Sequence, residues 1–190
     1  LFKKDKNLII PDQYHSNKCL VAKANNPYPK CDALVTSDNS LILGITTADC
    51  LPIIFYDLEN QVIGIAHAGW KGLVKGVIHN TVKKMISLGA QKKSIKSIIG
   101  PCIRVKSYEV NEEFVNKLKT QYQRFAIRQI QKIYFDLPKL AKYILSESNI
   151  SSVHDIKKNT FLDKNYFSFR ESKKKKQKDY GRNLNLISLI

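Results

Sequence analysis

Long apolar runs are absent from this sequence, and their absence limits where the protein can reside. No window approaches the roughly 20 uninterrupted apolar residues that a membrane-spanning helix requires. The first residues, Leu1 to Lys6, are not followed by the apolar stretch of a secretory signal. We therefore expect a soluble cytoplasmic protein without a membrane partner.

Cysteine is scarce, and the residues present are widely spaced. The chain has four of them, Cys19, Cys31, Cys50 and Cys102, with no C-x-x-C pair. A chain of 190 residues with a hydrophobic content of 43% can build its own core without disulfide bonds. We expect free thiols in a reducing compartment, which leaves a thiolate available for metal binding or nucleophilic chemistry.

Acidic residues are few relative to basic ones. Lysine and arginine number 32 against 16 acids, which gives a formal net charge of +16. Such a charge attracts anionic ligands such as nucleotides, phosphate or nucleic acid. The longest basic run, Lys173–Lys176, has no interleaved aromatic residues and belongs to no recognised nucleic-acid module. We expect this run to be a solvated, mobile loop, and we do not expect nucleic acid as a partner.

Histidine is also scarce, with four residues in the chain. His79 lies among lysines on the polar face of an expected helix, and His154 lies in a polar stretch. We expect both to be without function. His15 and His67 remain as candidates for chemistry.

The pattern that is present consists of strands interspersed with helices. Apolar and β-branched runs predict strands at 41–56, 61–66, 94–99, 153–156, 166–169 and 184–190. Helical spacing and capping residues predict a helix over 73–86 that Gly89 ends, one that starts at Asn111, and one from Asp136 through Leu145. This order indicates the α/β (α+β) class, with a mixed sheet in a single domain spanning residues 1–190.

A hairpin brings one cysteine and one histidine together in this scheme. If Leu58 and Glu59 are the central residues of a turn over 57–60, Cys50 pairs with His67 across two antiparallel strands. Directly paired residues have Cβ atoms about 4.5–5.5 Å apart on the same face of a sheet. That separation suits two ligands of one metal ion.

His15 is the remaining histidine and the candidate for a third ligand. Two imidazoles and one thiolate leave the fourth tetrahedral position of Zn²⁺ open to water or substrate, as in catalytic zinc sites. The residues by themselves are equally compatible with a nucleophilic pair of Cys50 and His67, in which His15 has no role.

These residues lie in motifs that resemble a known family. The matching blocks, in chain order, are Gln13–His15, Asp32–Thr36, Thr47–Pro52, His67–Gly72, Gly100-Pro101, Tyr108–Val110, Phe167–Arg170 and Gly181-Arg182. Across nearly its whole length the chain resembles the laccase-domain family of the YfiH type, whose members are called polyphenol oxidases or purine nucleoside phosphorylases.

The resemblance implies a metal site, an activity and a fold. It implies that His15, Cys50 and His67 are zinc ligands. It implies phosphorolysis of adenosine, inosine and methylthioadenosine to base and sugar 1-phosphate, with adenosine deamination as a second activity. Purine nucleosides and phosphate would then be the partners. The implied fold consists of mixed β-sheets packed together and flanked by helices.

The chain also departs from the family pattern. Members usually carry a further segment before the first histidine, including an Arg-x-Gly-Gly sequence, so we expect the N-terminal part of the family domain to be missing here. Lys71 stands where the His-Ala-Gly-Trp block usually continues with arginine, and Asn159 stands where a Cys-Thr pair is common.

The chemistry assigns provisional roles to four further residues. Arg170 and Arg182 are candidates for holding phosphate, because guanidinium forks match phosphate oxygens. Asp49 is a candidate for orienting a metal ligand or for acting as the acid toward the purine, although it could equally be an ordinary buried turn residue. For deamination, Asp49 or Glu109 would carry the proton, since the His-x-Glu motif of zinc deaminases is absent.

The word laccase can be tested against the composition. Four-electron reduction of O₂ uses several histidine-rich copper centres, and four histidines cannot furnish them. We expect zinc as the cofactor, with copper only as an adventitious ligand of the same site. The alternatives are a cysteine hydrolase that uses Cys50 and His67, and a basic binding module without catalysis.

Overall fold

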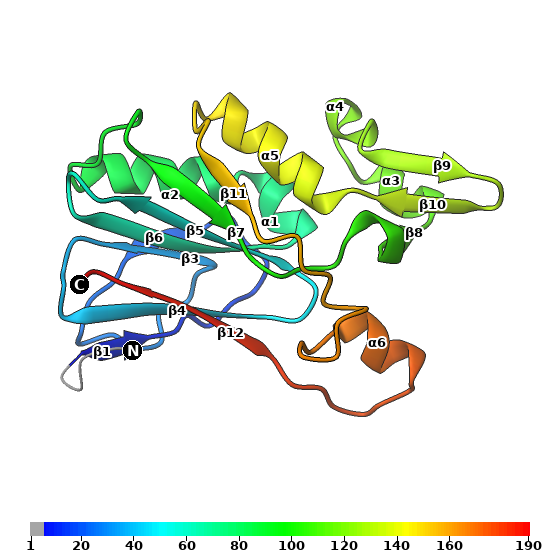
Figure 1. The fold of residues 1–190 in the computed structure, drawn as a ribbon, viewed down its shortest axis with the longest axis horizontal. Coiled ribbons are helices and arrows are strands. Elements are labelled where there is room, and N and C mark those ends of the chain that lie inside the picture. The colour runs from blue at the N-terminus through cyan, green and yellow to red at the C-terminus, as the bar shows by residue number, and fades with distance from the viewer. Residues whose placement is uncertain (1–5) are drawn as a thin grey trace.

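The computed structural model describes residues 6–190, so residues 1–5 of the expected domain lie outside the described part. The fold has layers (Figure 1): helices lie above a large central sheet, and a small sheet lies below it. A second small sheet projects to one side beyond α5. Within residues 6–190, no helix combines the length and apolar character that a membrane crossing demands.

The strands alternate irregularly with short helices along the chain. The strands are β1 (Asn7–Ile9), β2 (Cys19–Val21), β3 (Ala33–Thr36), β4 (Leu41–Thr47), β5 (Leu51–Asp57), β6 (Val62–Ala68), β7 (Lys96–Ile99), β8 (Glu109–Val110), β9 (Ala126–Gln129), β10 (Lys132–Phe135), β11 (Val153–Asp155) and β12 (Asn183–Ser188). The helices are α1 (Trp70–Lys75), α2 (Val77–Ser87), α3 (Glu112–Asn116), α4 (Thr120–Gln123), α5 (Leu137–Glu147) and α6 (Phe169–Lys174), with a 3₁₀ turn at Val105–Ser107.

The central sheet has six strands in the order β11-β7-β5-β6-β3-β2. Its four inner strands are antiparallel to one another, and each edge strand is parallel to the inner strand beside it. The two small sheets have the orders β1-β4-β12 and β8-β10-β9. This mixed architecture confirms the expected fold class of mixed sheets flanked by helices.

Two apolar cores cover the two faces of the central sheet. Residues at alternate positions of β6 divide between them, because successive side chains of a strand point to opposite faces. Val62 and Ala66 pack with α1, α2 and α5, whereas Ile63 and Ile65 pack with the β1-β4-β12 sheet. The central sheet is therefore the middle layer of the molecule, and its strand ends lie between two packed layers.

Most of the elements expected from sequence are present close to their expected bounds. The expected strands at 61–66, 94–99, 153–156 and 184–190 correspond to β6, β7, β11 and β12. Asn111 and Asp136 cap α3 and α5 as expected, each accepting a hydrogen bond from the backbone N–H three residues ahead.

The single strand expected over 41–56 is wrong. The structure has two strands in different sheets, β4 and β5, separated by a bend at residues 48–50. Asp49 has a positive φ of 78°, which no regular strand residue adopts. Both strands are almost fully buried, so their apolar residues form one continuous run that hides the break. Cys50 therefore lies in the bend and not inside a strand.

The helix expected over 73–86 is interrupted. Gly76 has φ 97° and ψ 33°, the left-handed conformation that glycine adopts without steric cost, and it separates α1 from α2. The second helix ends at Ser87, two residues before Gly89, which also has a positive φ.

The expected pairing of Cys50 with His67 is also wrong in register. The hairpin loop comprises residues 58–61, so Asp57 pairs with Val62 and Pro52 pairs with His67. The Asp57 carboxylate accepts hydrogen bonds from the backbone and side-chain amides of Asn60, which stabilises this longer loop. The partner of His67 thus moves by two residues along β5, and a shift of two preserves the face on which a side chain lies.

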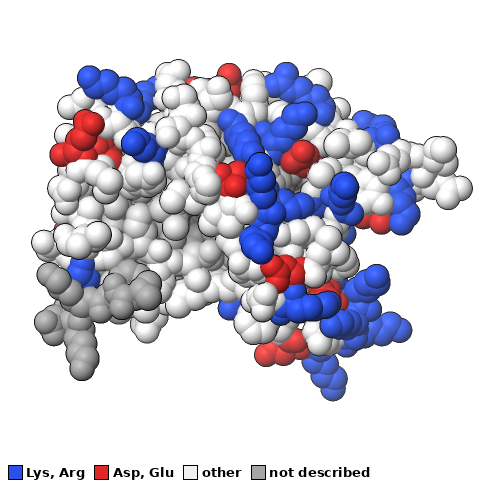
Figure 2. All heavy atoms as spheres, viewed as in Figure 1, with Lys and Arg blue, Asp and Glu red and all other residues white. Residues whose placement is uncertain are grey.

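The strand expected at 166–169 is wrong as well. Ser168 caps α6 and accepts a hydrogen bond from the backbone N–H of Glu171, and the helix begins at Phe169. The first two lysines of the Lys173–Lys176 run lie in this helix, so the run is not wholly a loop. All four lysines are exposed, and Figure 2 shows basic side chains gathered over the part of the surface that α6 forms.

Candidate metal centre

Three side chains with metal-ligand atoms meet where β6 ends and β5 begins. They are His15, Cys50 and His67, and their ligand atoms all lie within 4.8 Å of one another. His67 is the penultimate residue of β6 and is buried, Cys50 lies in the bend before β5, and His15 is exposed. The structure thus brings together the residues that the sequence motifs indicated, although they come from three separate segments.

The carboxylate of Asp32 orients His67. Nδ1 of His67 lies 2.8 Å from Oδ1 of Asp32 at a site where both side chains are buried. A carboxylate only accepts hydrogen bonds, so Nδ1 of His67 carries a proton. Nε2 is then the ring atom that a metal would bind. The backbone N–H of His67 also donates to the carbonyl of Asp32 at 2.7 Å, which ties β6 to the start of β3.

The same carboxylate organises the loop that carries His15. It accepts the backbone N–H groups of Tyr14, His15 and Ser16 at 3.3, 3.0 and 2.6 Å, and the hydroxyl of Ser16 at 2.7 Å. His15 has a positive φ of 60°, a conformation that costs free energy unless neighbouring contacts hold it. Asp32 provides these contacts, so one buried carboxylate positions two of the three donors.

The pKa values around Asp32 follow from this network. Burial alone would raise the pKa of Asp32, but the hydrogen bonds from His67 and Ser16 lower it to about 2. Burial would likewise lower the pKa of His67, but Asp32 and Cys50 raise it to about 9. Asp32 is therefore an ionised acceptor at neutral pH.

The thiol of Cys50 lies between the two imidazoles. Its Sγ is 3.7 Å from Nε2 of His15, and the two imidazole rings meet edge to face with centroids 4.8 Å apart. Burial opposes ionisation of the thiol, but the hydrogen bonds with His15 and His67 lower its pKa to about 7. A substantial thiolate fraction is then present at neutral pH, and the thiolate is the form that binds metals or attacks electrophiles.

Gly69 leaves the space that the three donors need. A Cβ atom at this position would lie 2.9 Å from Sγ of Cys50 and 3.1 Å from Cδ2 of His15. Any larger residue would push against both side chains. The donor set of two imidazoles and one thiolate, the oriented His67 and this open space together fit a tetrahedral Zn²⁺ with one position left for a ligand.

Two cavities meet at the cluster and share His15, Ala48, Cys50 and Phe169. The first, called the Tyr108 cavity, has a volume of about 280 Å³ and is further lined by Asp49, Trp70, Lys71, Ile103, Tyr108, Leu137 and Arg170. The second, called the Thr46 cavity, has a volume of about 450 Å³ and is further lined by Pro11, Asp12, Gln13, Thr46, Thr47, His67, Tyr180 and Arg182. The cluster therefore faces an aromatic cavity on one side and a more polar one on the other.

The two candidate arginines lie one in each cavity. The guanidinium of Arg170 stacks 5.4 Å from the centre of the Tyr108 ring and donates to the carbonyl of Glu109 at 2.8 Å. That of Arg182 lies 3.8 Å from the Tyr180 ring centre and donates to its carbonyl at 2.9 Å. Each guanidinium has five N–H donors, so both retain donors for an anionic ligand.

Asp49 anchors the start of α6 next to the Cys50 bend. Its carboxylate accepts the hydroxyls of Thr160 and Ser168 at 2.7 and 3.0 Å and the backbone N–H of Arg170 at 2.6 Å. Because both oxygens are engaged, this geometry favours a positioning role for Asp49 over that of a proton donor to a ligand.

The remaining titratable candidates lie away from the cluster. His79 is exposed on α2, with its Nδ1 2.9 Å from the hydroxyl of Ser148, and His154 is exposed on β11. The carboxylate of Glu109 pairs with Lys132 at 3.2 Å on the surface. None of these three side chains lines the Tyr108 or Thr46 cavity.

Sequence reasoning gave no role to Asp32, Gly69 or Tyr108. The sequence did carry a signal for Asp32, an acidic residue directly before an apolar strand, where burial requires compensating hydrogen bonds. Gly69 appeared only within the His67–Gly72 block, because the atoms that its Cβ would meet come from the distant residues His15 and Cys50.

Comparisons with known proteins show which family the chain matches. The model of a family described as multi-copper polyphenol oxidoreductase laccase matches residues 1–190. Purine nucleoside phosphorylase RP494 of Rickettsia prowazekii is 32% identical over 166 residues, which cover 84% of this chain and 68% of that protein. Purine nucleoside phosphorylase RC0672 of Rickettsia conorii is 29% identical over 187 residues, covering 95% and 77%. The crystal structure of Neisseria meningitidis protein NMB0706 superposes with a TM-score of 0.84 at 28% identity, covering 97% of this chain and 75% of that one.

Proposed function

The chain belongs to the family described as multi-copper polyphenol oxidoreductase laccase, and on this premise we propose that it is a zinc-dependent purine nucleoside phosphorylase. Its substrates would be adenosine, inosine and methylthioadenosine, which react with phosphate to give the free base and a sugar 1-phosphate. The observation that carries the proposal is the His15–Cys50–His67 cluster between two cavities that each contain an arginine. Relatives named purine nucleoside phosphorylase support it.

The reaction requires a site for the purine, a site for phosphate and help for the leaving group. A phosphate oxygen forms a bond to the anomeric carbon of the sugar, and the bond to the purine nitrogen breaks with its electron pair going to the base. When bound by His15, Cys50 and His67, zinc would supply Lewis-acid stabilisation of negative charge in the site.

The residues of one cavity suit the purine of the nucleoside, and those of the other suit phosphate. The Tyr108 cavity offers aromatic and apolar side chains, namely Trp70, Tyr108 and Leu137, against which a purine ring can stack or pack. Arg182 faces the more polar Thr46 cavity, where its free guanidinium donors can hold phosphate. Arg170 lies over Tyr108 and would hold a phosphate or sugar oxygen at the junction.

Adenosine deamination is part of the proposal as a second activity. It needs a group that carries a proton to the amino group that leaves the purine. Asp49 is engaged by three hydrogen bonds and Glu109 by an ion pair, so either would have to exchange its present partner. Deamination would therefore be slower than phosphorolysis.

Copper-dependent oxidation of phenols is not part of the proposal, although the family description mentions it. The chain has four histidines, and two of them, His79 and His154, lie on the surface away from the cluster. One site with two imidazoles and one thiolate cannot collect the four electrons that reduction of O₂ to water requires. Copper bound there would be adventitious.

A cysteine hydrolase is the second candidate, and the lowered pKa of Cys50 favours it. A thiolate beside a protonated imidazole is the resting arrangement of a cysteine nucleophile and its base. The position of His15 argues for the metal instead. Its Nε2 lies within 3.7 Å of Sγ, and Asp32 holds its strained backbone, which a nucleophilic pair alone would not require.

The cysteines of the chain bear on the compartment in which the protein works. All four cysteines are free in the structure, which suits a reducing compartment, and we propose the cytoplasm. We also propose that residues 1–190 act as one catalytic unit with purine nucleosides and phosphate as its partners.

Product analysis tests the proposal directly. Zinc-loaded protein is incubated with inosine in the presence and absence of phosphate, and hypoxanthine and ribose 1-phosphate are quantified. We expect both products in equal amounts, and only with phosphate. Hypoxanthine with free ribose, or no cleavage by a fully zinc-loaded protein, would overturn the phosphorylase assignment.

A further inference from the structure

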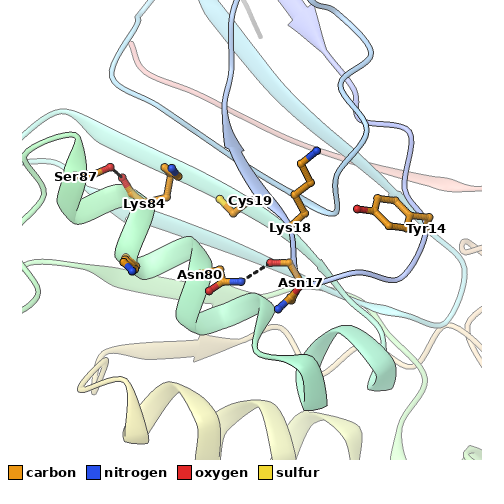
Figure 3. A pocket seen from close by; sticks show the side chains of 8 residues that line it. Tyr14, Asn17, Lys18, Cys19, Asn80, Lys84 and Ser87 are labelled. Carbon is orange, nitrogen blue, oxygen red and sulfur yellow. Dashed lines mark hydrogen bonds between the residues drawn. The ribbon is translucent and has the colours of Figure 1, made fainter.

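A third cavity, separate from the two at the metal centre, is lined by basic side chains. It has a volume of about 560 Å³ and lies between α2 and the edge strand β2. Figure 3 shows Asn80, Lys84 and Ser87 on α2, Lys18 and Cys19 at the start of β2, and Tyr14 at one end. It shares no lining residue with the Tyr108 or Thr46 cavity.

The charge of this cavity has one sign. Lys18, Lys83 and Lys84 line it, and no acidic residue does. Within residues 6–190, none of these three ammonium groups lies within 4.0 Å of a carboxylate. Like charges that line one cavity without paired carboxylates give it a positive potential, which favours a bound anion.

The floor of the cavity is neutral and its walls are held in place. Burial raises the pKa of the Cys19 thiol to about 12, so no thiolate opposes an anion there. Asn80 donates to the carbonyl of Asn17 at 2.8 Å, and Asn17 donates to the carbonyl of Lys75 at 2.9 Å. These bonds join the loop before β2 to the helical layer, so the cavity does not have to form on binding.

Tyr14 adds an aromatic surface at the end of the cavity. The residue is 47% exposed, and the ammonium of Lys30 lies 5.5 Å from the ring centre. A fourth positive charge, that of Lys30, therefore lies beside the Tyr14 end of the cavity.

We propose that this cavity binds a small phosphate-bearing metabolite with at least two negative charges. Lysine ammonium groups bind phosphate oxygens as point charges, and a volume of this size is typical of small-molecule sites. The site is separate from the metal centre, and the proposal does not depend on the proposed function.

An anion bound in this cavity would act on the metal centre through the loop that carries Tyr14 and His15. Tyr14 lines the cavity, His15 is its neighbour in the chain, and both donate backbone hydrogen bonds to Asp32. An anion that contacts Tyr14 or Lys18 therefore acts on the segment that presents a metal-ligand atom, and any coupling must be reciprocal.

Calorimetric titration with pyrophosphate tests the site. We expect wild-type protein to bind pyrophosphate, and the Lys83→Gln/Lys84→Gln variant to bind it about tenfold or more weakly. The Lys92→Gln/Lys93→Gln variant is the matched control, because it removes two exposed charges outside this cavity. It should bind within about twofold of wild type if location, and not net charge, determines affinity.

A third variant separates this cavity from the metal centre. Arg182→Gln removes a proposed phosphate donor of the Thr46 cavity only, so it should keep the pyrophosphate binding that Lys83→Gln/Lys84→Gln loses. Three results would overturn the proposal: no binding to wild-type protein, equal weakening in both lysine variants, or loss of binding in Arg182→Gln alone. ADP as a second probe distinguishes a nucleotide from a simple phosphate, since stacking on Tyr14 would make ADP bind more tightly than pyrophosphate.

Discussion

At the scale of single residues, Asp32 connects the parts of the metal centre. Its two oxygens accept hydrogen bonds from the segment 14–16 and from Nδ1 of His67. Partners of this kind hold metal ligands in the orientation that binding needs, and their loss weakens metal affinity. We therefore expect the metal affinity of the candidate site to depend on Asp32, although this residue supplies no ligand atom itself.

Asp32→Asn should weaken zinc binding by about 10- to 100-fold. The oxygen of the asparagine amide can still accept hydrogen bonds, but the side chain carries no charge. Its NH₂ group would face N–H donors and cannot accept from them. Zinc affinity is measured by competition with a chelating dye. Asp38→Asn is the control and should leave zinc affinity unchanged, since Asp38 is exposed and its carboxylate accepts hydrogen bonds from Ser40. Equal affinity in Asp32→Asn and wild type would refute the positioning role.

Gly69→Ala should abolish zinc binding at low zinc concentration, because its Cβ would meet Sγ of Cys50 at 2.9 Å. Gly44→Ala is a matched control, since its Cβ would meet Leu186 at the same distance but far from the cluster. Both variants should lower the melting temperature through crowding. Only Gly69→Ala should lose zinc, as measured by metal analysis after gel filtration, and equal zinc content in the two would count against the geometry.

Single residues also show how far sequence reasoning reaches. His15, Cys50 and His67 could be chosen because few histidines and cysteines compete with them and because they lie in distinctive motifs. Asp32 could not be assigned its role, since its partners lie 16 and 35 positions away and the contact depends on how β3 meets β6. Function that arises from side-chain contacts between distant segments is the part that one sequence does not reveal.

At the scale of elements, the bend between β4 and β5 positions the chemistry. It carries the chain from the small sheet to the central one and presents Cys50 directly before the start of β5. Asp49 in the same bend binds Thr160, Ser168 and the backbone of Arg170, so α6 starts beside the metal centre. The bend that interrupts the strand expected over 41–56 is thus the feature that assembles the site.

Thr160→Val should raise the KM for phosphate several-fold while zinc content stays at the wild-type level. The change removes the hydroxyl that donates to Asp49 at 2.7 Å and loosens the segment that carries Arg170. Thr160→Ser keeps the hydroxyl and is the control. Steady-state phosphorolysis at varied phosphate checks this, and identical KM values for the two variants would show that the anchor does not position Arg170.

The elements that sequence reasoning missed have a common physical cause. Buried strands such as β4 and β5 read as one apolar run, because both faces of each are covered and no polar alternation marks the break. The capping residue Ser168 and Glu171 three positions later formed a helix-start signal that was interpreted as a strand. Helices with clear caps, such as α5 after Asp136, were predicted because their signals are local.

An ion-pair cluster holds the outer edge of the central sheet. Asp155 at the end of β11 accepts from Arg104, with one contact at 3.0 Å, and pairs with Lys142 of α5 at 2.8 Å. Although burial opposes it, these partners hold the pKa of the Asp155 carboxyl well below its ordinary range. A depressed pKa stabilises the fold above the unfolded value of about 4, and this stability is lost as the pH falls further.

Asp155→Asn should therefore lower the free energy of unfolding at pH 7 by at least about 1.5 kcal/mol. The difference from wild type should shrink as the pH falls below about 4, because the Asp155 carboxyl of the unfolded chain is protonated there and that of the folded protein only at lower pH. Urea unfolding at several pH values measures both effects. Glu113→Gln, which breaks the exposed pair with Lys117, serves as the control and should leave stability essentially unchanged. A pH-independent difference would contradict the assignment.

At the scale of the whole molecule, the candidate active site lies where the layers meet. His15 precedes the edge strand β2, Cys50 precedes β5, and His67 ends β6, while the arginines come from α6 and the segment before β12. The site thus requires the central sheet, the small sheet and α6 at once. A net charge of +16 surrounds it and favours anionic ligands such as phosphate.

The central claim is that His15, Cys50 and His67 hold one metal ion that phosphorolysis requires. The most direct test is to strip the protein with a chelator, titrate it with zinc, and measure bound zinc and inosine phosphorolysis together in wild type, His15→Ala and His79→Ala. We expect activity to return with one zinc per chain in wild type and in His79→Ala, because His79 lies on the surface away from the cluster. His15→Ala should bind zinc weakly and stay inactive, since it loses one of three protein ligands. Full phosphorolysis by zinc-free wild type or by zinc-free His15→Ala would contradict the account.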